Sequence, residues 1–323
     1  MDSYVYQTEC REIGYFQIDE PNESGDYKIQ YCPANNNSMD YVGATTWKTY
    51  STEFPDVITP TKLNAENLHR LISLILTKND SRGVFNVIKT LKPTNAGSFT
   101  PRINRGGPGL FYRQYLEPEM SEEVRAYENI INSLEDIFQT IEPENGNLST
   151  YGNKIRELII IACTEVEYLL KMILTTSGVK PKRRNYTTED YIWCLGAMKL
   201  DWYHVSFANY VGFNQLKPFR GWSNAAPTAS LPWYDTYNKV KHDRGNTKSK
   251  ATIEVLINSI AAIHILLEAQ YGKEIFEFRF QHTYRTLFRT NFRPKWEMEY
   301  LSTPILSFHG PSWVEGKLPT FQE

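Results

Sequence analysis

The chain has 323 residues, 22% of them charged, and a formal net charge of −2. This length exceeds the usual size of one domain and predicts two compact units. The balanced charge excludes a protein coated with positive charge, so any contact with nucleic acid requires a local patch. A structural zinc site is not expected, because the cysteines are widely separated and form no CxxC or Cys/His ligand pair: Cys10, Cys32, Cys163 and Cys194. We expect no other metal or cofactor.

The chain also lacks the patterns of secreted and membrane proteins. Its first 20 residues have neither a basic n-region nor an apolar h-region, and no run of about 18 apolar residues follows. We therefore expect a cytoplasmic protein without a membrane partner.

The first part of the chain is typical of strands and hairpins. Short alternating bursts (IGYFQI, DYKIQY, DYVGATTW) are separated by the turn-forming clusters PNESG and PANNNS. Helical spacing over residues 64–76 predicts a helix capped by Asn64, and PTNAGSFTPRINRGGPG is typical of a loop. These patterns predict an N-terminal α+β domain over residues 1–118.

The second part has helical periodicity. Residues 122–140 are amphipathic and follow Ser121, a good N-cap, and residues 154–175 place their apolar side chains on one broad face. Further helices are predicted in this part, the last of them apolar nearly all round: residues 188–199, 233–242 and 250–271. The fold class is therefore α+β, with an antiparallel four- or five-helix bundle over residues 119–272.

Residues 273–323 form a C-terminal extension that can pack on the N-terminal domain. Aromatic residues and arginines alternate in EIFEFRFQHTYRTLFRTNFRPKWEMEYL. This pattern allows one or two strands that return to the N-terminal sheet, and it equally allows an interaction face.

The segment LPWYDTYNKVKHDR, residues 231–244, concentrates polar chemistry on a short helix. Asn238 and Lys239 lie four and three residues before His242 and therefore project from the same face, flanked by Lys241. A neutral imidazole can take a proton from a ribose hydroxyl, while an amine or amide stabilises charge on the phosphate. The alternative is that these cations only complement the negative end of the helix dipole.

The order of these segments resembles the HEPN superfamily (higher eukaryotes and prokaryotes nucleotide-binding) over about residues 120–272. The segments are IRELIIIACTEVEYLLK, PFRGW, LPWYDTYNKVKHDR and an apolar final helix. The resemblance implies a helical bundle, and in some members a metal-independent ribonuclease of toxin or antiviral-defence type. Its motif is an arginine, a polar residue and a histidine. Asn238 and His242 match this motif, whereas Tyr237 occupies the arginine position.

The hypothesis is therefore a HEPN-like protein that binds RNA or nucleotide, with a metal-independent endoribonuclease activity. His242 is the general base, Asn238 positions the phosphate or the imidazole, and Lys239 and Lys241 stabilise charge. Further contacts, including a glutamate that orients the imidazole, are expected from flanking residues: Arg244, Arg156, Glu165 and Tyr237. The resemblance also implies a homodimer whose motif helices meet at a two-fold interface.

The alternative hypothesis is a catalytically inactive HEPN-like dimerisation or interaction module. Its N-terminal domain would then sense a ligand or partner. Tyr237 favours this alternative, because arginine offers phosphate a permanent planar fork and tyrosine offers one neutral donor.

Overall fold

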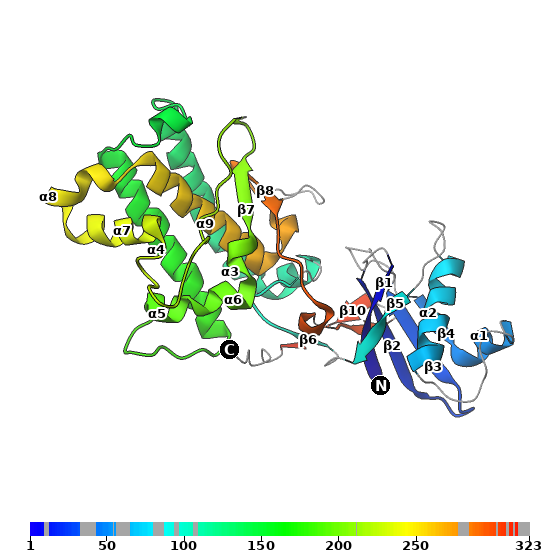
Figure 1. Cartoon of the computed structure of the whole chain (residues 1–323). Helices are drawn as coiled ribbons and strands as arrows, with labels where there is room; N and C mark the ends of the chain where they lie inside the picture. Colours follow the sequence, from blue (N-terminus) through cyan, green and yellow to red (C-terminus); the bar gives the residue numbers. More distant parts are fainter. Residues whose placement is uncertain are drawn as a thin grey trace. The chain divides into compact units, whose positions relative to one another are not determined.

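In the computed structural model the chain forms two compact units (Figure 1). The β unit is built mainly from residues 1–100 and 296–318, and the helical unit mainly from 101–105 and 109–295. The predicted α+β fold class is confirmed. The structure describes residues 1–9, 13–32, 43–53, 55, 65–79, 87–93, 97–105, 109–210, 212–276, 284–301, 303–307, 310–312 and 314–315.

The β unit contains a five-stranded antiparallel sheet in the order β4-β3-β2-β1-β5. Its turn between β2 and β3 is the predicted one at PNESG. The Asn22 side chain accepts hydrogen bonds from the backbone N–H groups of Ser24 and Asp26, and Gly25 takes the positive φ of 77° that the turn requires. PANNNS lies outside the described residues. The strands are β1 (Asp2–Thr8), β2 (Ile13–Pro21), β3 (Tyr27–Cys32), β4 (Gly43–Thr46) and β5 (Val87–Pro93).

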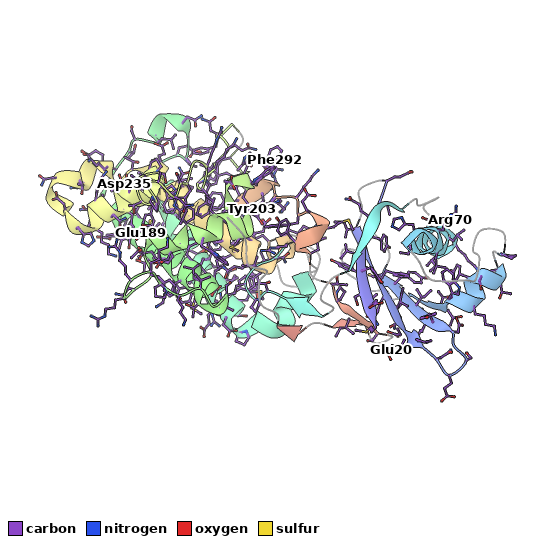
Figure 2. All side chains as sticks on the ribbon, turned by 60° about the horizontal axis from the view of Figure 1, so that its bottom comes forward. Glu20, Arg70, Glu189, Tyr203, Asp235 and Phe292 are labelled. Carbon is purple, nitrogen blue, oxygen red and sulfur yellow. The ribbon has the colours of Figure 1, made fainter. Side chains whose placement is uncertain are left out.

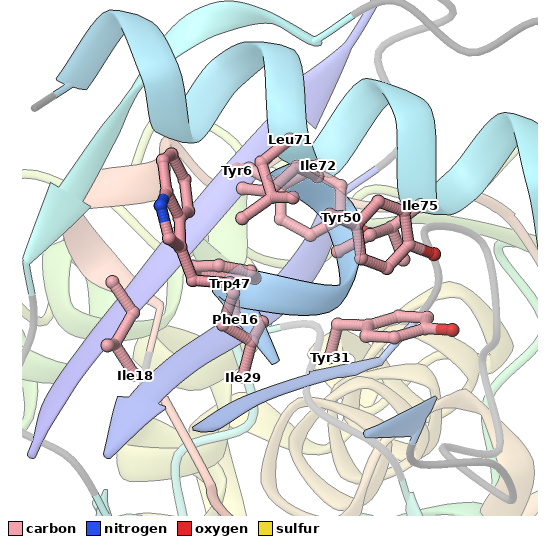
Figure 3. Close-up of a cluster of buried hydrophobic side chains, with 10 residues drawn as sticks. All are labelled: Tyr6, Phe16, Ile18, Ile29, Tyr31, Trp47, Tyr50, Leu71, Ile72 and Ile75. Carbon is pink, nitrogen blue, oxygen red and sulfur yellow. The ribbon is translucent and has the colours of Figure 1, made fainter. Parts of the chain in front are cut away.

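Two helices, α1 (Trp47–Glu53) and α2 (Ala65–Asn79), cover the sheet and complete its core (Figure 3). Gly14 of β2 lies opposite Tyr6 of β1, and the tyrosine ring covers the glycine. The core side chains are aromatic and β-branched or leucine residues: Tyr6, Phe16, Ile18, Ile29, Tyr31, Trp47, Tyr50, Leu71, Ile72 and Ile75.

The C-terminal segments contribute to both units. β9 (Ile305–Ser307) pairs with β10 (Gly310–Ser312), and the Gln17 side chain of β2 bonds to both backbone groups of Leu306, at 2.9 and 3.3 Å. β11 (Val314–Glu315) pairs in parallel with β6 (Ser98–Phe99). The arginine-rich segment behaves differently, because its strand β8 (Phe288–Phe292) pairs with β7 (His204–Phe207) inside the helical unit.

The helical unit is organised around α9 (Ile253–Tyr271), which packs against α3 (Gly109–Phe138), α4 (Asn153–Thr176) and α7 (Pro232–His242) (Figure 1). By length and composition α9 alone among the described helices could cross a membrane, but 83% of its apolar window is buried in the protein. It is therefore a core helix. Shorter elements are α5 (Thr188–Tyr191), α6 (Trp193–Met198), α8 (Arg244–Thr247), η1 (Asn145–Asn147), η2 (Leu200–Trp202), η3 (Lys248–Lys250), η4 (Lys273–Ile275) and, in the β unit, η5 (Met298–Tyr300).

Two helix predictions differ from the structure. The helix expected from 122 begins at Gly109 and runs through Pro118 and Ser121, because a proline removes only one backbone donor from a long helix whose later turns are held by packing. The helix expected over 188–199 is divided at Ile192 into α5 and α6.

Candidate functional site

The candidate site is built on α7, and the helix predicted over residues 233–242 is confirmed. Pro232 occupies its first turn, where the missing N–H costs nothing, and Asp235 lies near the positive end of the dipole. One face is buried in the unit by Trp233, Tyr234, Tyr237 and Val240. The opposite face is left for the polar residues.

His242 is exposed at the C-terminal end of α7, and Asn238 is half-buried one turn earlier. The Lys239 amine forms an ion pair with the Asp235 carboxylate, one turn toward the N-terminus. This pair draws the amine away from His242, which follows Lys239 by three residues. Figure 2 labels Asp235 on α7.

A partly buried hydrogen-bond network fixes the face of α7 that packs on α4. The Tyr237 hydroxyl donates to Glu167 Oε2 at 3.3 Å and accepts from Lys241 Nζ at 2.8 Å. Tyr234 donates to the other oxygen of Glu167 at 2.5 Å, and burial together with this glutamate raises the pKa of Tyr234. Because Tyr237 has no exposed surface, the expectation that it contacts substrate is wrong.

Lys241 belongs to the same network although most of its side chain is exposed. Its hydrogen bond with Tyr237 raises the pKa of the amine, so the amine stays charged. A lysine has three donors, and the bond to Tyr237 uses one of them. Two N–H groups therefore remain for an anion at the surface.

Arg156 of α4 holds the end of α7. Its Nε and Nη2 donate to the backbone oxygen of Val240 at 3.3 and 3.1 Å. This oxygen is one of the last carbonyls of the helix, which have no partner within it. Arg156 thus lies beside α7 as expected, but it is bound to backbone.

Glu165 lies on the other side of α4. Burial and the nearby Glu123 raise its pKa to about 7, and its buried Oε1 has no hydrogen-bond partner among the described residues. Helix geometry explains the placement. Glu165 follows Arg156 by nine residues, or about two and a half turns, and therefore lies on the opposite side of α4. Glu167 follows Arg156 by eleven residues, or about three turns, and lies on the same side. The acid beside α7 is therefore Glu167. The expected pairing of Glu165 with the imidazole is replaced by proximity to Glu123.

The neighbours of Glu165 form a second buried network. Arg102 pairs with Glu123 at 2.6 Å, and its Nη1 also donates to Gln270 Oε1 at 3.0 Å. Tyr271 donates to the other oxygen of Glu123 at 2.7 Å. Arg102 comes from RINRGGPG and is almost completely buried, so this arginine holds the unit together.

The segment after α7 adds further cations next to His242. Asp243 accepts from the backbone N–H of Asn246 at 3.2 Å and thereby starts α8, and Thr247 donates to the Lys239 carbonyl at 3.3 Å. Lys248 and Lys250 of η3 are exposed. The side chain of Arg244 lies outside the described residues. We call the exposed residues Lys239, Lys241, His242, Lys248 and Lys250 the basic surface.

The buried His264 of α9 plays a structural part. Its Nδ1 and Nε2 lie 3.1 Å from the hydroxyls of Thr286 and Thr290. Burial and the nearby Arg293 lower its pKa to about 3, which keeps the ring neutral. His264 is therefore a core histidine with both ring nitrogens in hydrogen-bond contact. No group of three or more potential metal ligands occurs in the described part of the chain.

The fold and site define an α+β protein whose helical unit carries an exposed histidine within a basic surface. No protein-family model, curated protein or solved structure matches the chain.

Proposed function

We propose that the helical unit is a HEPN-like bundle that binds RNA through the basic surface and cleaves it without a metal ion. The observation that supports this proposal is the exposure of His242 among four exposed lysines at the end of α7 and in η3. Clustered cations are the usual contacts of a phosphate backbone. The proposed partner is RNA and the proposed location is the cytoplasm. A toxin or antiviral-defence role is consistent with both.

The proposed reaction needs one base and local positive charge. Neutral His242 takes the proton of a ribose 2′-hydroxyl, and the 2′-oxygen attacks the adjacent phosphorus. The bond to the 5′-oxygen breaks, and this oxygen takes a proton from water. Lys241 stabilises the charge on the phosphate with its two remaining donors, and Asn238 positions the phosphate.

The direct test is RNA cleavage in the presence of EDTA. We expect wild type to cleave a labelled single-stranded RNA and His242→Ala to lose at least about 100-fold in rate, the usual contribution of a general base. His69→Ala, which changes a half-buried histidine of the β unit, is the control and should retain activity. Equal rates for wild type and His242→Ala would refute the mechanism.

A second candidate function is an inactive interaction module that dimerises. The observation that favours it is the enclosure of Tyr237 at the motif arginine position, together with the protein partners of Arg156 and Lys239. This candidate predicts a concentration-independent dimer by sedimentation and no RNA cleavage under any condition. A monomer that cleaves RNA would exclude it.

A further inference from the structure

Two aromatic rings stand out on the surface at the β7–β8 ribbon. Trp202, at the end of η2, is 59% exposed, and Phe292, at the end of β8, is 57% exposed. They are the most exposed large hydrophobic residues among those described in the helical unit. Exposed aromatic rings of this size offer flat faces on which a ligand can stack.

The two rings are held in place by their neighbours. Phe292 is the strand partner of His204, and the two rings meet edge to face with centroids 5.0 Å apart. Lys199 lies with Nζ 6.0 Å from the centre of the Trp202 ring, and it donates to the Lys295 carbonyl at 2.9 Å. Tyr203 is buried, whereas Trp202 before it is exposed and His204 after it is half-buried.

The two segments that carry these rings are richer in cations than in acids. Residues 199–220 and 285–295 contain seven lysines and arginines against one acid, Asp201. Arg285 and Arg293 are paired with Glu135 and Glu268. Arg220, Arg289 and Lys295 are exposed, and Lys217 is half-buried.

The pKa of His204 indicates that two of these cations lie close to its ring. Its pKa is lowered by burial and then by the charges of Lys217 and Arg220. The cations therefore lie near the same surface as Phe292, against which His204 packs. In Figures 1 and 2 this ribbon and α7 lie on different sides of the helical unit.

We propose that this surface binds single-stranded nucleic acid by stacking bases on Trp202 and Phe292. The phosphates of the nucleic acid contact the four cations of the surface, Lys217, Arg220, Arg289 and Lys295. Exposed rings interleaved with cations suit unpaired bases, whose faces are free, and a duplex keeps those faces covered. An apolar protein partner would be poorly matched by so many cations. The stacking surface does not depend on catalysis at His242.

The experiment measures binding of fluorescein-labelled oligo(U) and oligo(dT) of about 12 nucleotides, with an RNA duplex of equal length as comparison. Trp202→Ala and Phe292→Ala should each weaken single-strand binding on the order of tenfold. Trp202→Phe should stay within about threefold of wild type, because phenylalanine keeps a stacking face, whereas Trp202→Leu should behave like Trp202→Ala. Ile161→Ala, at 54% exposure on α4, is the matched control and should not change binding.

The outcomes separate stacking from other effects and from the proposed function. Wild-type affinity in Trp202→Leu, or equal affinity for duplex and single strand, would overturn the inference. Tighter binding of oligo(U) than of oligo(dT) identifies the ligand as RNA. Equal affinity for the two means that the surface binds single-stranded RNA and DNA alike. Oligo(dT) has no 2′-hydroxyl and cannot undergo the proposed cleavage, so its binding tests the stacking surface separately from the ribonuclease activity.

Discussion

At the scale of single residues, Glu165 gives the clearest dependence on pH. Its pKa is raised from 4.5 to about 7 by burial and by Glu123. The folded state therefore holds this proton more tightly than the unfolded state. The contribution of Glu165 to stability is complete below pH 4.5, falls as pH rises from 4.5 to about 7, and is then lost.

Glu165→Gln imitates the protonated form and should remove this dependence. We expect it to match wild type near pH 5 and to exceed the wild-type free energy of unfolding at pH 8 by on the order of 1–2 kcal/mol, a value reduced because the side chain is only half-buried. Urea unfolding at both pH values measures the difference. Glu157→Gln, on the exposed side of the same helix, is the control and should show no such gain.

A substitution of Tyr237 tests whether the residue at the motif arginine position has a structural role. Tyr237→Phe removes the hydroxyl between Glu167 and Lys241, leaving a half-buried carboxylate oxygen with one donor fewer. We expect the free energy of unfolding to fall by about 1–3 kcal/mol while RNA affinity stays at the wild-type value. Tyr151→Phe, at an exposed tyrosine, should change stability by less than about 0.5 kcal/mol. Unchanged stability with reduced RNA affinity would place Tyr237 in the binding surface.

At the scale of elements, the end of α7 depends on α4. Arg156→Ala removes the two donors to the Val240 carbonyl, so the last turn that carries His242 should fray. We expect a loss of about 1–2 kcal/mol in the free energy of unfolding and faster amide hydrogen exchange over residues 240–243. Lys154→Ala, in the same turn of α4 but exposed, is the control. Wild-type rates of amide hydrogen exchange over residues 240–243 in Arg156→Ala would show that the last turn of α7 is stable without Arg156.

In the sheet, the β1–β2 pair requires a glycine. A Cβ at Gly14 would lie 2.2 Å from Cζ of Tyr6, and the tyrosine is held by its hydrogen bond to the Cys32 carbonyl at 3.1 Å. Gly14→Ala should therefore destabilise the β unit by about 1–3 kcal/mol in thermal unfolding. Gly196→Ala, where nothing lies within 4 Å, is the control and should be neutral or slightly stabilising. A Gly14→Ala protein as stable as wild type would mean that the ring moves freely.

At the scale of the whole molecule, local patterns predicted the helices that are amphipathic or apolar over their full length. α4, α7 and α9 match their predicted ranges within a few residues, because apolar spacing is a property of neighbouring residues. The start of α3 was missed because Ser121 and the residues after it carry the signals of a helix start.

The interactions that define the candidate site were harder to predict. Glu167 was recoverable from its eleven-residue spacing to Arg156, which places both on one side of α4. The network of Arg102 was not, because Glu123 and Gln270 lie 21 and 168 residues away along the chain. Pairings over such separations are set by tertiary packing, which one sequence does not display.

The most direct test of the account is the affinity of the protein for RNA when the basic surface is made less positive. Lys248→Glu with Lys250→Glu should weaken RNA binding at least about tenfold and lower the slope of log affinity against log salt by about 0.7 for each phosphate that the protein no longer neutralises. Lys171→Glu with Lys180→Glu makes the same change in net charge at exposed lysines elsewhere on the unit and should leave the slope unchanged. Equal weakening in both double variants, or none in the first, would contradict RNA binding at the end of α7.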